Sequence, residues 1–239
     1  MSLAPTPGAL DRAPLVRDMF DRIAPRYDLA NRVMSLGLDQ GWRRDAVRAL
    51  ADSGKGDVMG LCAGTLDLTL QLLANGARSV QAVDFSPQML KSGAPKVPAG
   101  APVTLTVADA RELPFPDASF DAILCGFGLR NVPELPRAIA ECARVLRPGG
   151  RLVILELCKP ETLFSRVVQG SYNRLVVPVV GGLITGFGDA YRYLAGSIDA
   201  FTTRTELVAL LEQCGLEATG RDVFPPVASI VVGRKGAAP

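Results

Sequence analysis

Five short apolar segments in the middle of the chain constrain its fold more than any other feature. They are rich in residues that favour strands and are bounded by turn residues, and they cover residues 57–61, 79–83, 103–107, 120–125 and 151–156. Helical patterns separate them. The clearest covers residues 134–146, with apolar side chains on one face, and the turn 147–150 follows it. Strands that alternate with helices predict a parallel sheet covered by helices on both faces.

Helices and a closing strand pair are predicted on either side of these five strands. Residues 15–52 favour two or three helices, and residues 205–214 favour another helix that ends at Gly215. The segments 216–224 and 227–235 predict an antiparallel strand pair. The expected fold class is therefore α/β, with a doubly wound, mostly parallel seven-stranded sheet, an antiparallel C-terminal strand pair and N-terminal helices.

One stretch of the chain, residues 159–200, fits no strand–helix unit. We interpret it as a helical lid insertion over the strand ends, where ligands bind in open α/β sheets. It contains the longest apolar run, residues 175–187, which includes Pro178 and is shorter than the roughly 20 residues that cross a bilayer. The expected organisation is a flexible N-terminus over residues 1–14 and a single domain over residues 15–239.

The composition argues against several classes of protein. The net charge is +2 and no run of Lys or Arg occurs, so nucleic acid is not an expected partner. No apolar segment follows basic residues at the start, so no signal peptide is predicted and a cytoplasmic location is expected. Five cysteines without a CxxC pair favour a reducing compartment and small buried thiols over a metal site. There is no histidine, so any acid–base step needs another side chain.

Small and acidic residues follow the first three predicted strands. After the first strand, the turn Gly64-Thr65 precedes a helix whose free N–H groups can face a ligand. Asp84 ends the second strand 20 residues after Gly64, a spacing at which carboxylates bind ribose hydroxyls. Asp109, beside the small Ala110, ends the third strand and could meet an adenine amino group. As structural alternatives, Gly64-Thr65 could form an ordinary tight turn, Asp84 could cap a helix and Asp109 could be a loop aspartate. Together, however, these residues favour an adenosine ligand. The lack of a GxGxxG motif argues against NAD or FAD.

Three blocks of sequence, in order along the chain, resemble one known family. They are MFDRIAPRYDLANRVMSLGLDQGWRR (19–44), the block from CGFGLRN to ELCKP (125–160) and DAYRYLAGSIDAF (189–201). These blocks resemble the menaquinone/ubiquinone ring C-methyltransferase family, and the resemblance covers residues 15–235. The segment LPFPDASFD (113–121) is similar to class I methyltransferases generally. The resemblance implies a class I methyltransferase fold, S-adenosyl-L-methionine as cofactor and a prenylated quinol as substrate.

The resemblance implies that residues at the strand ends bind S-adenosyl-L-methionine. In addition to the turn glycine Gly64, these are Thr65, Asp84, Asp109, Ala110 and Gly126. Two positions depart from the family. Where this chain has Gly60, the family has an acid that helps to hold the methionine ammonium, a contact worth about 1.5–3 kcal/mol. Where this chain has Leu66, the family has a glycine, and leucine adds bulk near the ligand and does not readily adopt a positive φ.

The resemblance places Arg130 and Asn131 at the quinol end of the site and Tyr27 in the helical part that closes over it, and these three residues are the catalytic candidates. Carbon methylation needs an electron-rich ring carbon, which a quinol supplies once a hydroxyl loses its proton, so the enzyme must stabilise a phenolate. Arg130 suits this task as a fixed cation, Asn131 could orient the quinol oxygen, and water, Tyr27 or a carboxylate could take the proton. From the residues alone, Arg130 could instead form a surface ion pair, Asn131 could belong to a turn or cap, and Tyr27 could be a core aromatic.

The predicted lid bears on the partners of the protein. Its apolar residues, including 163–168 and 175–187, favour a groove for an isoprenoid tail, with transient contact to a membrane surface at the inner membrane; packing on the sheet helices is the alternative. A homodimer is a further hypothesis. The expected function is methylation of a quinol ring carbon, most specifically demethylmenaquinol to menaquinol. A non-catalytic relative, motivated by Gly60 and Leu66, and a methyltransferase for another aromatic or lipid metabolite are the alternatives.

Overall fold

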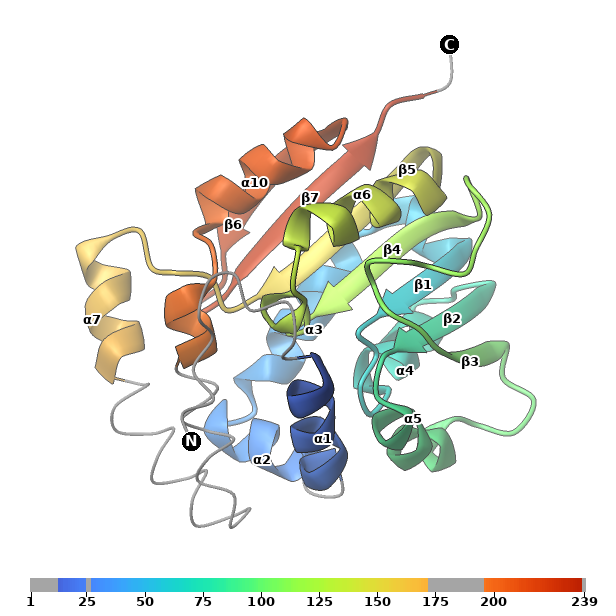
Figure 1. Cartoon of the computed structure of the whole chain (residues 1–239), viewed down its shortest axis with the longest axis horizontal. Coiled ribbons are helices and arrows are strands. Elements are labelled where there is room, and N and C mark those ends of the chain that lie inside the picture. Colours follow the sequence, from blue (N-terminus) through green and yellow to red (C-terminus); the bar gives the residue numbers. More distant parts are fainter. Residues whose placement is uncertain (1–12, 25–26, 172–195, 238–239) are drawn as a thin grey trace.

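The computed structural model describes residues 13–24, 27–171 and 196–237. A seven-stranded sheet with the order β3-β2-β1-β4-β5-β7-β6 forms the centre of this part of the chain (Figure 1). Strand β7 runs antiparallel to its neighbours β5 and β6, and the other neighbouring strands pair in parallel. The strands are β1 (Asp57–Leu61), β2 (Ser79–Asp84), β3 (Val103–Val107), β4 (Phe120–Gly126), β5 (Leu146–Glu156), β6 (Leu216–Asp222) and β7 (Ser229–Lys235). The predicted fold class is confirmed.

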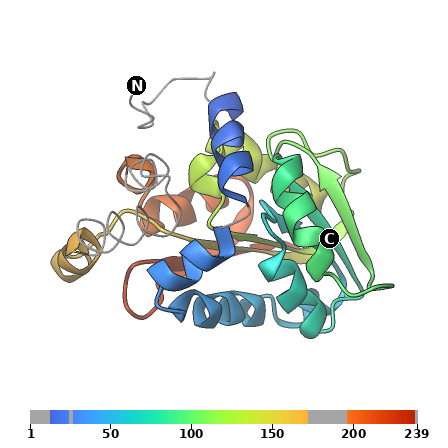
Figure 2. The same ribbon diagram turned by 90° about the horizontal axis from the view of Figure 1, so that it is seen from below.

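Helices cover both faces of the sheet, which Figure 2 shows nearly edge-on. Helices α3, α4 and α5 lie on one face, and α6 and α10 lie on the other. Helices α1 and α2 lie beyond the ends of the central strands (Figure 1). The described α-helices are α1 (Ala13–Ile23), α2 (Tyr27–Met34), α3 (Leu38–Ala49), α4 (Asp67–Ala74), α5 (Pro87–Gly93), α6 (Leu135–Val145), α7 (Leu163–Ser171) and α10 (Arg204–Gln213), and the short 3-10 helices are η2 (Ala51–Lys55), η3 (Ala94–Lys96) and η4 (Leu129–Asn131).

Local signals in the sequence explain where several helices begin. Helix α5 begins at Pro87, which has no N–H to leave unpaired, and the Ser86 hydroxyl accepts a hydrogen bond from the N–H of Met89 at 3.0 Å. Helix α10 begins with a capping box in which Thr203 and Glu206 satisfy each other's backbone N–H groups. The cap of α5 fixes the helix start that follows β2, and so it fixes the loop between them, which carries part of the site.

Two predicted boundaries differ from the structure, and the predicted lid is described only in part. The turn 147–150 lies inside strand β5, which starts at Leu146 and pairs with β4 through a register shift at this point. Helix α1 begins at Ala13, so the last two residues of the predicted flexible N-terminus are helical, while residues 1–12 lie outside the described residues. Within the predicted lid, the structure describes α7 and a helical turn over residues 196–200, and residues 172–195 lie outside the described residues.

The registers of the central strands align their carboxyl ends. Leu61, the last residue of β1, pairs with Val83 of β2 on one side and with Cys125 of β4 on the other. The loops after these strands therefore leave the sheet at one edge, next to α1 and α2. Helix α3 is tied to the loop between β6 and β7, because the indole N–H of Trp42 donates to the carbonyl oxygen of Phe224 at 3.0 Å. None of the described helices is both long and apolar enough to cross a membrane.

Candidate functional site

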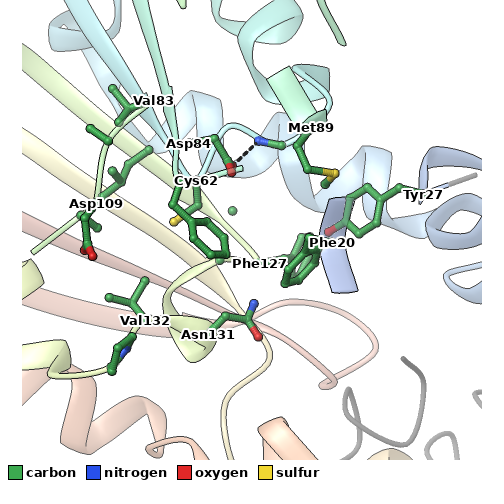
Figure 3. Close-up of a pocket in the computed structure, with 18 residues that line it drawn as sticks. Phe20, Tyr27, Cys62, Val83, Asp84, Met89, Asp109, Phe127, Asn131 and Val132 are labelled. Atoms are coloured by element: carbon green, nitrogen blue, oxygen red, sulfur yellow. Dashed lines mark hydrogen bonds between the residues drawn. The ribbon is translucent and has the colours of Figure 1, made fainter. Parts of the chain in front are cut away.

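A pocket that is partly open to solvent lies at the carboxyl ends of the central strands, with about 690 Å³ of empty space that includes some of the open solvent (Figure 3). The carboxyl ends of the strands and the loops after β1, β2, β3 and β4 form most of its wall, and helices α1, α2 and α5 contribute Phe20, Tyr27 and Met89. In the view of Figure 3, Asp109 and Tyr27 lie at opposite ends of the pocket, with Asp84 and Cys62 between them. The residues that line it are Phe20, Tyr27, Leu61, Cys62, Gly64, Val83, Asp84, Phe85, Met89, Ala108, Asp109, Ala110, Gly126, Phe127, Gly128, Asn131, Val132 and Pro133.

The loop after β1 is shaped by three residues with a left-handed backbone. The φ angles of Cys62, Gly64 and Leu66 are 51°, 55° and 70°, so two of the three positions that favour glycine hold larger residues. The turn brings the N–H of Gly64 toward β2, where it donates to Asp84 Oδ2 at 2.8 Å (Figure 3). This hydrogen bond joins the first two loops of the pocket.

Asp84 lies at the floor of the pocket as a buried carboxylate. Its Oδ1 accepts a hydrogen bond from the N–H of Ser86 at 2.9 Å, and its Oδ2 accepts from Gly64. Burial raises the pKa of Asp84 to about 6, despite these backbone hydrogen bonds. The side chain can therefore accept hydrogen bonds from ligand hydroxyls near neutral pH.

Asp109 and Ala110 lie at the end of the pocket opposite Tyr27 (Figure 3). Two nitrogens of the Arg111 guanidinium, Nε and Nη2, donate to the Asp109 carboxylate at 2.7–3.1 Å, and Arg111 Nη1 donates to Glu134 at 2.9 Å. These hydrogen bonds from Arg111 hold the pKa of Asp109 below its usual range, so this carboxyl is ionised at neutral pH. The small side chain of Ala110 leaves room beside it for a flat ring.

The two positions that depart from the family do not obstruct the pocket. Leu66 is fully buried and packs with Ala82 and Leu90, and Gly93 makes room for it, since a Cβ at Gly93 would lie 2.6 Å from Leu66 Cγ. A Cβ at Gly60 would face Thr69 Oγ1 at 3.6 Å, on the α4 side of the sheet. The expectation that Leu66 adds bulk next to the ligand is wrong, because its side chain points into the core.

The turn after β4 contacts the loop after β1. Phe127 has a φ of 60°, and its N–H donates to the carbonyl oxygen of Leu155 at 2.8 Å. Gly128 follows, and a Cβ there would lie 2.2 Å from Cys62 Cβ, so the approach of the two loops requires glycine. A Cβ at Gly126 would lie 2.4 Å from Leu68 Cδ1, so a larger residue there would require the end of the Leu68 side chain to move. This turn places Phe127 and Asn131 in the pocket wall.

Arg130 forms a buried ion pair behind this turn. Its Nη1 donates to Glu156 Oε1 at 2.7 Å and to the carbonyl oxygen of Phe127 at 2.5 Å, and its backbone N–H donates to Glu156 Oε2 at 3.2 Å. The side chains of Arg130 and Glu156 are only 7% and 1% exposed. Arg130 is not among the residues that line the pocket, whereas its neighbour Asn131 is. The buried pair therefore holds the turn that carries Phe127 and Asn131.

Helices α1 and α2 bring two aromatic side chains over the pocket. The Phe20 ring lies edge-to-face with Tyr27 and with Phe85, at centroid distances of 6.1 and 6.4 Å. Polar contacts hold these helices: the Ser86 hydroxyl donates to Asp21, and the Thr65 hydroxyl donates to Asp28, which also pairs with Lys96. The structure thus uses Thr65 to anchor α2, and this residue, predicted to bind the cofactor, does not line the pocket.

The structure brings most of the predicted site residues together. The pocket wall contains Tyr27, Gly64, Asp84, Asp109, Ala110, Gly126 and Asn131, and it does not contain Thr65 or Arg130. Sequence reasoning missed the aromatic lining formed by Phe20, Phe85 and Phe127. Phe20 and Phe127 lie within the sequence blocks that resemble the family, and this was the available signal for them.

The geometry fits an adenosyl group. The buried Asp84 carboxylate faces the middle of the pocket, the carboxylate of Asp109 stands beside the small Ala110 at one end, and Gly64 lets a ligand approach the backbone between them. Beyond them, Phe20, Phe127 and Asn131 leave an aromatic region with one amide group. The pocket can thus hold a nucleoside and an aromatic ring side by side.

Comparison with solved structures agrees with this architecture. The [4+2]-cyclase SpnF superimposes with a TM-score of 0.72 at 17% identity, over 100% of both chains. An S-adenosylmethionine-dependent methyltransferase from Mesorhizobium loti superimposes with a TM-score of 0.60 at 19% identity, over 83% of this chain and 100% of that chain. At these identities the likeness establishes the fold, which a cyclase and a methyltransferase share.

Sequence comparison is more specific. The ubiquinone/menaquinone biosynthesis C-methyltransferase UbiE of Geobacter sulfurreducens is 41% identical over 228 residues, which are 92% of this chain and 88% of that protein. The demethylmenaquinone methyltransferase of Thermus thermophilus is 43% identical over 218 residues, which are 90% of this chain and 99% of that protein. A family model described as the ubiE/COQ5 methyltransferase family matches residues 9–233. The chain therefore belongs to the ubiE/COQ5 methyltransferase family.

Proposed function

We propose that this protein transfers a methyl group from S-adenosyl-L-methionine to a ring carbon of a prenylated quinol, most specifically converting demethylmenaquinol to menaquinol. The relatives named as C-methyltransferases of ubiquinone and menaquinone synthesis support the reaction class. The observation that carries the proposal is the pocket itself, in which carboxylates that suit an adenosyl group adjoin an aromatic region at the carboxyl ends of the strands.

Residues of the first three loops are proposed to hold the cofactor. Asp84 would accept hydrogen bonds from the ribose hydroxyls, Asp109 would accept one from the adenine amino group, and Ala110 and Gly126 would leave room for the ligand. When bound, S-adenosyl-L-methionine supplies an electrophilic methyl group on a sulfonium. Thr65 contributes indirectly, because its hydroxyl donates to Asp28 and so fixes helix α2 next to the pocket.

The turn after β4 is proposed to position the acceptor. Asn131 lines the pocket and would donate its amide hydrogens to a quinol oxygen, which favours the ionised form of that oxygen. Arg130 would act without touching the quinol. Its guanidinium binds Glu156 and the carbonyl oxygen of Phe127 and so fixes the position of Asn131. This indirect role replaces the direct contact between Arg130 and the phenolate that the resemblance implies.

The quinol must lose a proton during methylation, and the described pocket wall contains four ionisable side chains, namely Tyr27, Cys62, Asp84 and Asp109. Contact with the Cys125 thiol and burial raise the pKa of Cys62 well above its usual range, so Cys62 is a poor proton acceptor. Asp109 is bound by Arg111 at the far end of the pocket. We infer that Tyr27 or Asp84, directly or through water, receives the proton.

Exposed apolar side chains on helix α7 support the proposed access of a prenylated substrate. Leu163, Phe164 and Val167 are exposed by 77%, 66% and 60%. These residues belong to the segment predicted as a lid over a groove for the isoprenoid tail, and they would suit brief contact with a membrane surface. A cytoplasmic protein that associates with the inner membrane, and a homodimer, are further parts of this proposal.

A non-catalytic role in quinone synthesis is the second candidate, because Gly60 lacks the acid that the family carries. One experiment separates the two functions. Purified protein is incubated with S-adenosyl-L-methionine labelled on the methyl group and with reduced naphthoquinol or benzoquinol acceptors. Methyl transfer to naphthoquinol supports the proposal. Transfer only to another aromatic acceptor would keep the methyltransferase activity and replace the proposed substrate. Calorimetry that detects no cofactor binding, together with no transfer, would favour the non-catalytic role.

A further inference from the structure

Phe127 stands between the pocket and a buried cation. Its ring lines the pocket, and the guanidinium carbon of Arg43 lies over this ring, 5.4 Å from the centroid. Arg43 itself is not among the residues that line the pocket. Phe127 is thus the side chain through which Arg43 can act on a molecule in the pocket.

The cation is held firmly in this place. Arg43 Nε donates to Asp39 Oδ2 at 3.1 Å, and the two side chains are only 9% and 6% exposed. Asp39 is fixed in turn by the Ser35 hydroxyl at 2.8 Å and by the side-chain amide of Gln40 at 3.0 Å. Because Asp39 binds the Nε edge of the guanidinium, the planar group keeps its place over the Phe127 ring.

The conformation of Phe127 is costly and is maintained by its surroundings. A φ of 60° is rare for a bulky residue, and such strained residues concentrate at functional sites. The N–H of Phe127 donates to Leu155, its carbonyl oxygen accepts from Arg130, and the next residue must be Gly128 because of its contact with Cys62. Three separate contacts thus orient one aromatic ring between Arg43 and the pocket.

A cation over one face of an aromatic ring changes how the ring stacks. The face of a phenyl ring carries partial negative charge, and a guanidinium over it draws electron density toward itself. The ring then stacks more favourably against an electron-rich aromatic molecule and less favourably against an electron-poor one. A quinol, and above all its phenolate, is electron-rich, whereas the quinone of nearly the same shape is electron-poor.

We propose that Arg43 and Phe127 form a specificity-determining pair that favours the reduced, electron-rich acceptor ring over its oxidised quinone. The inference rests on the proposed function, because only the quinol offers a nucleophilic ring carbon and a bound quinone would block the site. Shape alone separates the two molecules poorly, so the electronic character of the pocket wall is a suitable means of discrimination.

The test compares equilibrium binding of a naphthoquinol and of the matching naphthoquinone. Each is titrated under anaerobic conditions, the quinol with excess reductant, in the presence of S-adenosyl-L-homocysteine so that no methyl transfer occurs. The wild type is expected to bind the quinol more tightly. Arg43→Met and Phe127→Leu are each expected to lower this preference by roughly three- to tenfold, and the double variant is expected to lower it no further than either one.

Two control variants distinguish a loss of the preference for quinol over quinone from a general loss of ligand binding in the pocket. Phe20→Leu removes an aromatic ring over which the described residues place no cation, so it should weaken both ligands alike and leave the preference unchanged. Arg44→Met removes the exposed neighbouring charge on α3 and should change neither affinity. Because Arg43→Met leaves Asp39 buried without its cation, Phe127→Leu serves as the variant that keeps the ion pair intact.

Methyl transfer by the wild type is measured in parallel. If the wild type transfers methyl but the preference for quinol is the same in Arg43→Met and Phe127→Leu as in the wild type, the role of the pair is refuted and the proposed function stands. If the wild type transfers methyl to no acceptor and shows no preference for quinol, the proposed function fails and this inference fails with it.

Discussion

Asp84 ends strand β2 and Asp109 lies two residues after strand β3, whereas Phe20 belongs to a helix that precedes the sheet and Phe127 to a strained turn after β4. The first pair belongs to what we call the cofactor half of the pocket, the part proposed to bind the cofactor, namely Gly64, Asp84, Asp109 and Ala110. The second belongs to what we call the acceptor half, the part proposed to bind the acceptor, namely Phe20, Tyr27, Phe127 and Asn131. In the cofactor half, strand order and register determine position. In the acceptor half, position depends on a buried ion pair, a strained backbone and two helices that precede the sheet.

This difference indicates how the two halves should respond to substitution. A change in the cofactor half removes a direct contact to the ligand, so it should alter cofactor affinity and leave the fold intact. A change behind the acceptor half removes a support, so it should alter stability and turnover together. The four predictions below test this contrast, in order of decreasing effect.

The largest effect is expected for Arg130→Ala. The substitution leaves the buried Glu156 carboxylate without its cation and should lower the free energy of unfolding by about 3–5 kcal/mol. Turnover should fall by more than cofactor affinity does, because Asn131 and Phe127 lose their support. Denaturant titration, calorimetry and methyl transfer measure the three quantities, with the exposed Arg137→Ala as control. Equal loss of turnover and of cofactor affinity would contradict the assignment of Arg130 to the acceptor half.

Asp84→Asn should lower cofactor affinity and leave acceptor affinity nearly unchanged. The amide keeps the size of the side chain but loses the charge-assisted hydrogen bonds to the ribose, which are worth about 1.5–3 kcal/mol, or roughly 10- to 150-fold in the dissociation constant. Calorimetric titration with S-adenosyl-L-methionine measures this change. The acceptor KM at saturating cofactor should stay within about twofold of the wild type, and Asp45→Asn on the surface of α3 is the control. A large rise in the acceptor KM would mean that Asp84 serves both halves.

Cofactor affinity should also depend on pH through Asp84. Because burial raises the pKa of Asp84 to about 6, the carboxyl gains a proton in the free protein as the pH falls below that value. Affinity should then fall toward tenfold per pH unit, since the neutral acid accepts ribose hydrogen bonds poorly. Stability should move the other way: the charged form is disfavoured in the folded protein, so the Asp84 contribution to the unfolding free energy declines as the pH rises from about 4 to 6. Asp84→Asn should abolish both dependences.

The smallest effect is expected for Gly60→Asp. The new Cβ would meet Thr69 Oγ1 at 3.6 Å, an ordinary contact, and the carboxylate could accept a hydrogen bond from this hydroxyl, which lacks a partner among the described residues. Because position 60 faces α4 and does not line the pocket, cofactor affinity should rise by no more than about threefold. Calorimetry on Gly60→Asp and on Gly60→Asp with Thr69→Val measures the gain and its dependence on the hydroxyl. A gain of a hundredfold would show that the acid reaches the cofactor directly.

The positions of Asp84 and Asp109 at the pocket were predictable because their signals are local. Buried strands end where apolar runs end, and a carboxylate at that point, as in Asp84 and Asp109, lies at the ligand edge of any parallel sheet. The strand boundaries of β1 and β3 agree with the apolar runs, residue for residue. A local rule that failed concerned Leu66, which adopts a positive φ because Gly93 and Leu90 give its side chain a buried site.

The acceptor half was predictable only in part because its determinants are distant in sequence. Arg130 was expected to face the quinol, but its partner Glu156 lies 26 residues later at the end of another strand. Thr65 was expected to face the cofactor, but Asp28 of α2 takes its hydroxyl. The backbone of Phe127 breaks the usual preference of bulky residues for negative φ, and nothing in the local sequence indicates that it should.

The position of β7 has a consequence for synthesis of the chain on the ribosome. This strand is the last of the sheet to be made, yet it inserts between β5 and β6, and the ammonium of Lys235 within it donates to the carbonyl oxygens of Ala143 and Leu146 at the end of α6. Until β7 emerges, β5 presents an unpaired edge and α6 has an uncapped end. Until β7 leaves the exit tunnel, the nascent protein therefore carries an aggregation-prone edge. Chaperones would protect the protein most during this period.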